Sequence, residues 1–146
     1  MDVKLNYYSR EWCEEAQRRL NSDTAHLAAA KNLTGAFCFR LYDCPDGTDR
    51  IAYWEFEQGR CVNLSWEAKP APTKEIRELP FDKSATRART SAPFDMLLAL
   101  NKGEVSILKL LTNPRYKIEG PKAEAMRYMK GLNSWNRVCM GIPTEE

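Results

Sequence analysis

The stretch GEVSILKLLTNPRYKIEG, residues 103–120, carries a helical pattern followed almost directly by a strand-like one. After Gly103, apolar residues recur with the spacing of a helix at positions 105, 107, 108, 110 and 111. Pro114 disfavours helix at the residue before it and ends the run. Residues 116–119 then alternate with a period of two, which predicts a half-buried strand. A short apolar helix is therefore expected to lead directly into a strand.

Upstream of this stretch, the N-terminal part of the chain predicts helical structure. Ser9 is a suitable N-cap. The residues after it place one apolar face at steps of three to four, namely Trp12, Cys13, Ala16 and Leu20. Ser22 or Asp23 can cap a second helical stretch. The pattern leaves open whether these are one kinked helix or two.

Three strand-like segments follow and predict an antiparallel meander. Residues 37–41, 51–57 and 61–66 alternate in polarity, with Asp46-Gly47 and Gln58-Gly59 at the turns between them. Their inward residues are expected to be Phe37, Phe39, Leu41, Ala52, Trp54, Phe56, Val62, Leu64 and Trp66. One face of this meander is therefore strongly apolar.

The rest of the chain predicts a loop, a further strand and more helices. Residues 67–83 hold three prolines among charges and are expected to be mostly loop, with a short strand over 84–90. Pro93 and Pro121 each suit the first turn of a helix. The order of elements indicates one α+β domain over residues 1–146, with helices covering one face of a sheet.

Composition excludes several classes of function. The 146 residues carry a net charge of +2, which is too small to favour binding of nucleic acid. Basic pairs such as Arg18-Arg19 are expected to be solvated. No apolar run reaches the roughly 18 residues of a membrane span. The N-terminus does not read as a secretory signal and the C-terminus IPTEE carries no peroxisomal address. The five widely spaced cysteines are expected to be reduced thiols of a cytoplasmic protein.

No pattern in the sequence specifies catalysis. The single histidine, His26, lies among alanines and is expected to be a surface or half-buried structural residue. The familiar hydrolase, zinc and phosphate-loop motifs are absent, and no C-x-x-C pair occurs. Cys38 and Cys61 fit the role of small hydrophobic residues. No catalytic residue, metal site or cofactor is therefore expected.

The second half of the chain carries an apolar excess that has two interpretations. Residues 94–111 contain ten large apolar side chains, and Met126 and Met129 follow on the last helix. All of this surface could be protein core. Alternatively, the helices could bridge the sheet and leave an apolar pocket, for which flexible methionines are suitable walls. Composition does not separate the two.

The order of these motifs resembles the sterol carrier protein (type-2) lipid-transfer family, in its stand-alone bacterial branch. In GEVSILKLLTNPRYKIEGPKAEAMRYM, the resemblance rests on a glycine after one helix, an apolar helix, the strand Tyr116-Lys117-Ile118-Glu119-Gly120 and a methionine-rich last helix. SREWCEEAQRRLNSD, AHLAAAKNLTGAFCF and WEFEQGRCVNLSW resemble the opening helices and central hairpin of that branch. The similarity extends over about residues 9–138.

This resemblance implies a five-stranded, mostly antiparallel sheet covered by helices, with a hydrophobic tunnel for fatty acids, fatty acyl-CoA or sterol-like molecules. The residues expected to line the tunnel are Trp54, Phe56, Phe94, Leu97, Leu98, Ile107, Leu110, Leu111, Met126 and Met129. Phe94 stands where many members carry tryptophan, and the stretch SATRART at 84–90 is more basic than usual.

Three functions follow from these observations. The leading hypothesis is a non-enzymatic lipid carrier, without nucleic-acid partners, that makes at most transient contact with membranes. The alternative is an accessory or regulatory subunit that uses the same fold to bind a partner protein. The third is a small enzyme acting on a bound lipid, which requires ionisable side chains with shifted pKa values inside the cavity. The ligand and the oligomeric state, including a dimer, are left open.

Overall fold

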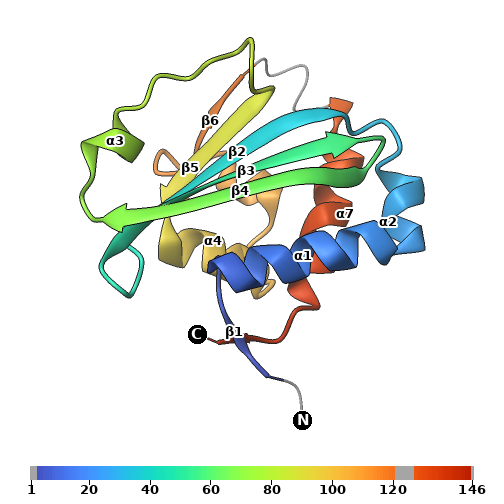
Figure 1. Cartoon of the computed structure of the whole chain (residues 1–146), viewed down its shortest axis with the longest axis horizontal. Coiled ribbons are helices and arrows are strands. Elements are labelled where there is room, and N and C mark those ends of the chain that lie inside the picture. The colour runs from blue at the N-terminus through green and yellow to red at the C-terminus, as the bar shows by residue number, and fades with distance from the viewer. Residues whose placement is uncertain (1–2, 121–126, 146) are drawn as a thin grey trace.

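A five-stranded sheet with helices against one face forms the framework of the computed structural model, which describes residues 3–120 and 127–145 (Figure 1). The sheet order is β4-β3-β2-β5-β6. Its strands are β2 (Gly35–Tyr42), β3 (Thr48–Glu57), β4 (Arg60–Pro70), β5 (Ala88–Pro93) and β6 (Lys117–Glu119). The β2–β5 pair is parallel and the other three pairs are antiparallel. The expected α+β fold with a mostly antiparallel sheet is confirmed.

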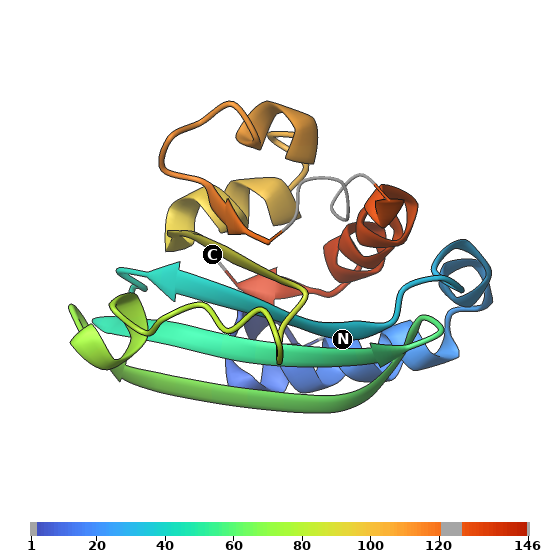
Figure 2. The same cartoon turned by 90° about the horizontal axis from the view of Figure 1, so that it is seen from above.

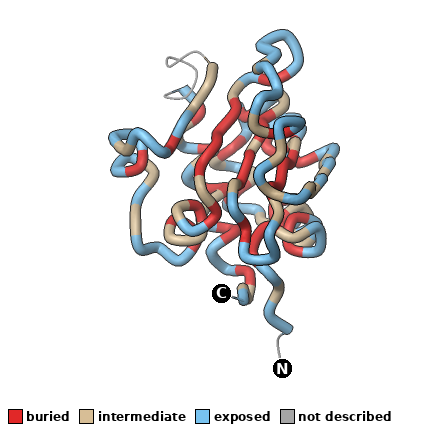
Figure 3. Tube along the Cα trace, turned by 90° about the vertical axis from the view of Figure 1, so that its left-hand side faces the viewer, coloured by how far each residue is buried: buried red, intermediate tan, exposed pale blue. Residues whose placement is uncertain are grey.

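The main helices lie on one side of this sheet and bury the core against it. They are α1 (Arg10–Ser22), α2 (Thr24–Ala29), α4 (Phe94–Asn101) and α7 (Met129–Met140). Figure 2 shows α4 and α7 along the same side of the strands, and Figure 3 shows the buried residues concentrated on the central strands and inner helix surfaces. The apolar face of the meander is buried as expected, with Ala52, Trp54 and Phe56 no more than 1% exposed.

Two side-chain caps divide the N-terminal helical region. The Trp12 backbone N–H donates to Ser9 Oγ, and the His26 backbone N–H donates to Asp23 Oδ1 at 2.8 Å. Asp23 itself is extended, with φ −88° and ψ 107°. An extended residue cannot continue a helix, so α1 and α2 are two helices rather than one kinked helix.

The β3–β4 hairpin has the predicted turn but not the predicted register. Gln58 and Gly59 both have positive φ, at 50° and 86°, the combination of a type I′ turn. The pairing then shifts after Glu55, so that Phe56 faces Cys61 rather than Val62. A bulge of this kind leaves one residue unpaired and turns it to the other face. The expectation that Val62 points inward is therefore wrong, and its side chain is 49% exposed.

Several other boundaries differ from the sequence expectation. The apolar helix expected over 104–111 is the single turn α5 (Ile107–Leu110), because Ser106 caps it late. Strand β4 extends into the expected loop as far as Pro70, and the short helix α3 (Lys74–Arg77) follows it. Strand β5 begins at Ala88, four residues after the expected start.

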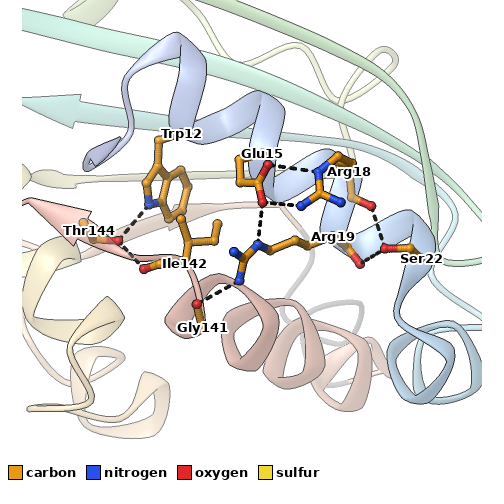
Figure 4. A network of polar contacts seen from close by, with 8 residues as sticks. All are labelled: Trp12, Glu15, Arg18, Arg19, Ser22, Gly141, Ile142 and Thr144. Atoms are coloured by element: carbon orange, nitrogen blue, oxygen red, sulfur yellow. Dashed lines mark hydrogen bonds and ion pairs between the residues drawn. The ribbon is translucent and has the colours of Figure 1, made fainter. Parts of the chain in front are cut away.

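A short parallel pair, not expected from the sequence, joins the two ends of the described chain. Strand β1 (Leu5–Asn6) pairs with β7 (Thr144–Glu145). Figure 4 shows how α1 supports this pair: Trp12 Nε1 donates to Thr144 Oγ1 at 3.1 Å, and Arg19 donates to the Gly141 carbonyl at 2.8 Å. Glu15 accepts hydrogen bonds from Arg18 and Arg19 in the same network. These contacts fix the position of Trp12 beneath the sheet.

Candidate functional site

A cavity of about 550 Å³ lies between the sheet and the helices, and we call it the main cavity. Its volume is within the range of small-molecule sites in proteins. Its apolar lining consists mainly of Phe37 and Phe39 of β2, Ala88 of β5, Ile118 of β6, Leu97 and Leu100 of α4, Ile107 and Leu111 around α5, and Met129, Leu132 and Trp135 of α7. Tyr7, Tyr8 and Trp12 add an aromatic wall from the N-terminal segment.

Side-chain size on neighbouring strands explains why the cavity lies under β2, β5 and β6. The inner face of β3 carries Trp54 and Phe56, which fill the space beneath it by contact with Trp135 at ring-centroid distances of 5.2 and 4.8 Å. The inner face of β5 carries only Ala88, Thr90 and Ala92. Small side chains do not reach the helical layer, so space remains between β5 and the helices.

The structure brings together four of the ten residues expected to line a tunnel. Leu97, Ile107, Leu111 and Met129 border the main cavity. Met126 lies outside the described residues. The remaining five do not border the cavity and pack elsewhere: Trp54, Phe56, Phe94, Leu98 and Leu110.

Those five residues belong to the packed core or its margin. Trp54 is fully buried, and its Nε1 donates to the Tyr8 hydroxyl at 3.0 Å. Phe94 packs against the Arg50 guanidinium, which lies 5.6 Å from its ring centroid. Leu110 is 3% exposed and faces the protein, whereas its neighbour Leu111 borders the cavity. Strand alternation for Trp54 and Phe56, and the helical spacing of the apolar residues for the other three, predicted that these side chains face inward. Neither pattern could show which side chains border a cavity.

The sequence expectation missed the aromatic wall formed by Tyr7, Tyr8 and Trp12. Tyr7 and Tyr8 precede the first helix and follow no periodic pattern. Their rings are 5.4 Å apart, and Tyr8 stacks on Trp12 at 5.1 Å. Two adjacent tyrosines before a capped helix were the available signal that this segment is buried, because an exposed loop rarely carries two neighbouring aromatic side chains.

Polar groups in the main cavity are few. Asn101, at the end of α4, is 6% exposed, and its Oδ1 is buried without a hydrogen-bond partner among the described residues. Thr90 and Tyr116 hydrogen-bond to each other. Arg87 lies at the solvent-exposed rim, where its Nε donates to the Thr34 carbonyl at 2.7 Å.

One cysteine and three tyrosines that border the cavity are held in their neutral forms by burial. Burial raises the pKa of the Cys139 thiol to about 12 and that of the Tyr116 hydroxyl to about 12. Burial also raises the pKa of Tyr7 and Tyr8 well above the usual value. At neutral pH these groups are therefore a thiol and phenols, which are weak nucleophiles.

His26 lies outside the main cavity and is more deeply buried than expected. Its side chain has no exposed surface, which corrects the expectation of a surface or half-buried residue. Nε2 lies 3.1 Å from the Gly59 carbonyl oxygen, and Nδ1 lies 2.9 Å from Ser134 Oγ. The carbonyl can only accept, so Nε2 carries the proton and Nδ1 accepts from Ser134. His26 thus connects α2, α7 and the β3–β4 turn.

Neither a metal-binding cluster nor a membrane-spanning helix is found among the described residues. Over residues 3–120 and 127–145, no three side chains of His, Cys, Asp or Glu converge in a way that could hold a metal ion. None of the described helices is both long enough and apolar enough to cross a membrane.

Solved structures with this fold include several sterol carrier proteins. Sterol carrier protein 2 aligns with a TM-score of 0.73 and 14% identity, over 94% of this chain and 99% of that one. A conserved hypothetical protein from Thermus thermophilus aligns with a TM-score of 0.75 and 13% identity, over 99% of this chain and 94% of that one. The sterol carrier protein domain 2 of Helicoverpa armigera aligns with a TM-score of 0.54 and 14% identity, over 93% of this chain and 91% of that one. No family model and no curated protein matches the sequence. The resemblance seen in the sequence is thus confirmed for the fold.

Proposed function

We propose that this protein binds and carries an apolar or amphipathic lipid, of the fatty acid, fatty acyl-CoA or sterol-like class, in the main cavity. The observation that carries this proposal is a cavity of about 550 Å³ between sheet and helices with a mostly aliphatic and aromatic lining. Transfer of each CH₂ from water to such a wall contributes roughly 0.8 kcal/mol. Association and ordering costs offset much of this gain, so micromolar affinity is expected.

We further propose that the protein acts as a carrier rather than an enzyme. The neutral Cys139, Tyr116, Tyr7 and Tyr8 side chains offer the ligand no activated nucleophile or general base. His26, the usual candidate for a general base, contacts Ser134 and Gly59 instead of the cavity. The five free, buried cysteines favour a reducing compartment such as the cytoplasm.

An accessory role in binding a partner protein is the second candidate. Leu108 is 66% exposed and Leu111 is 41% exposed, and both lie at α5 beside the main cavity. Adjacent exposed leucines are a feature of contact surfaces. Native mass spectrometry of protein from its own host distinguishes the two roles, because a carrier retains a lipid and an accessory subunit retains a protein.

Displacement of a fluorescent fatty acid tests the carrier proposal directly. We expect palmitate to displace the probe with about one ligand per chain and a Kd in the micromolar range. Trp135 borders the cavity, so its fluorescence should change on binding. If fatty acids, acyl-CoA and sterols of several sizes all fail to displace the probe, the proposal is wrong.

A further inference from the structure

The face of the sheet opposite to the main cavity carries a row of polar side chains across three strands. The register pairs Arg40 of β2 with Ser91 of β5, and Ser91 with Lys117 of β6. Paired residues on adjacent strands point to the same face, so all three side chains lie on the outer surface. They border a pocket of about 320 Å³, together with Tyr42, Arg77, Pro93 and Arg115, and we call it the basic pocket.

Arg40 forms the floor of the basic pocket and is fixed in place. Its side chain is 6% exposed. Nε donates to Ser91 Oγ at 2.7 Å and Nη1 donates to the Ile76 carbonyl at 2.8 Å. The hydroxyl of Ser91, a residue that is 1% exposed, accepts the bond from Arg40 Nε and keeps its own hydrogen available for a further acceptor.

The positive charge of this floor is incompletely compensated. Arg40 lies 3.4 Å from Glu119 Oε1, and Arg89 contacts the same oxygen at 2.7 Å. Both arginine side chains are 6% exposed. Two buried cations therefore share a single carboxylate oxygen. Burial lowers the pKa of Arg40 from its usual value, which is the direction expected for a cation that lacks full compensation.

The other cations of the basic pocket add to this excess. Arg77 is paired with the buried Asp49 at 2.7 Å and with Asp43 at 2.8 Å. Arg115 and Lys117 are exposed at the rim. Within the described part of the chain, neither side chain forms an ion pair or a hydrogen bond, although the Arg115 backbone N–H donates to Asn113 Oδ1.

The cations that border the pocket, the carboxylates that pair with them, and the further cation Arg89 that pairs with one of these carboxylates, Glu119, together give five cations against three carboxylates. The cations are Arg40, Arg77, Arg89, Arg115 and Lys117, and the carboxylates are Asp43, Asp49 and Glu119. The excess of two positive charges equals the charge of a phosphate monoester dianion. Guanidinium groups, an ammonium group and a hydroxyl donor are the groups that bind phosphate oxygens in proteins.

We propose that the basic pocket is an anion site that binds a phosphate group, between the Ser91 hydroxyl at its floor and Arg115 and Lys117 at its rim. The site is separated from the main cavity by the sheet, so it is independent of the lipid-carrying function. The phosphate belongs either to a small soluble phosphate or to a lipid headgroup, and the two sources share the same chemistry.

Titration with inorganic phosphate at low ionic strength, followed by calorimetry, tests the site. The informative variant is the double substitution Arg115→Gln/Lys117→Gln, which removes two exposed charges without disturbing a packed group. The control is Lys31→Gln/Arg60→Gln, which removes the same charge from exposed positions elsewhere. We expect the rim variant to weaken binding by about tenfold or more and the control by less than about twofold. Independently of these variants, the ¹⁵N shift of Arg40 Nε should respond to phosphate.

Binding to lipid vesicles distinguishes a lipid headgroup from a soluble phosphate as the source of the phosphate group. Co-sedimentation of the protein is compared between phosphatidylcholine vesicles with and without phosphatidic acid. Phosphate binding without recruitment to phosphatidic acid indicates a soluble ligand, and recruitment that depends on Arg115 and Lys117 indicates a headgroup. If neither probe binds, or if the control variant weakens binding as much as the rim variant, the proposal is wrong.

Discussion

The single histidine of the chain, His26, is held neutral by its surroundings. Burial lowers its pKa from the usual value, and the hydrogen bond to the Gly59 carbonyl only partly opposes this effect. Because the folded pKa lies below the unfolded pKa of about 6.5, protonation favours the unfolded chain. The contribution of His26 to stability is therefore complete above about pH 6.5 and is lost as the pH falls through its folded pKa.

We predict that the free energy of unfolding decreases from pH 6.5 to pH 5 with a slope of at most about 1.4 kcal/mol per pH unit. No other histidine is present to titrate in this range. His26→Gln retains a donor for Gly59 and should lower the stability by about 1–3 kcal/mol while removing most of the slope. Urea melts of the parent and the variant at several pH values measure both the free energy of unfolding and its slope with pH. An unchanged slope in His26→Gln would mean that other groups cause the pH dependence.

Asn101 borders the main cavity, and its buried side-chain oxygen has no hydrogen-bond partner among the described residues. A buried oxygen without a partner costs roughly 1–3 kcal/mol, and leucine has a similar volume. We predict that Asn101→Leu is as stable as the parent or more stable by about 1 kcal/mol, and that it binds palmitate no more weakly. Asn101→Asp should instead be destabilised, because it places an unpaired carboxylate there. A large loss of stability in Asn101→Leu by denaturant melts would show that the amide has an essential partner.

At the scale of elements, α1 and α5 both present leucines at helical spacing but in different surroundings. Leu20 on α1 has no exposed surface, whereas Leu111 after α5 is 41% exposed and borders the cavity. We predict that Leu20→Ala costs about 2–5 kcal/mol and Leu111→Ala about 1 kcal/mol. Leu111→Trp should leave the fold intact and weaken palmitate binding about tenfold, because the larger side chain enters the cavity. Denaturant melts and palmitate titrations of the three variants check this contrast. If Leu111→Trp unfolds the protein while Leu111→Ala binds normally, residue 111 belongs to the core.

Elements whose determinants are local could be predicted from the sequence. The Ser9 cap, the Gln58-Gly59 turn and the alternation in β3 each depend on a few neighbouring residues, and the structure contains all three. The β1–β7 pair and the bulge at Val62 depend on partners distant in the chain or across the sheet, so no local pattern indicated them.

The position of the cavity could be predicted only in part, because it too depends on residues that are distant in the chain. The apolar residues of α4, α5 and α7 were evident from spacing. The cavity lies under β5 because the side chains of β3 and β5 differ in size. Trp54 and Phe56 fill the layer beneath β3, whereas Ala88 and Thr90 do not fill it beneath β5. This comparison needs the strand order, which the sequence alone does not supply.

At the scale of the whole molecule, the sheet separates two chemically different faces. The inner face, against the helices, encloses the apolar main cavity. The outer face carries the basic pocket beside a small apolar cluster of Cys38, Ile51 and Ile76. The short helix α3 lies against this outer face, where Arg77 pairs with Asp49. A lipid and a phosphate group could therefore be bound at the same time without contact.

Isotope-filtered nuclear Overhauser spectra of methyl-labelled protein with unlabelled palmitate test the central claim most directly, because they locate a bound lipid. Leu97, Ile107 and Leu132 border the main cavity, whereas Leu20 is sealed in the core and Ile51 lies on the outer face. We predict contacts from the palmitate chain to the methyl groups of the first three residues and none to those of the last two. Contacts to Ile51, or binding without contacts to any of the three cavity residues, would contradict the assignment of the main cavity as the lipid site.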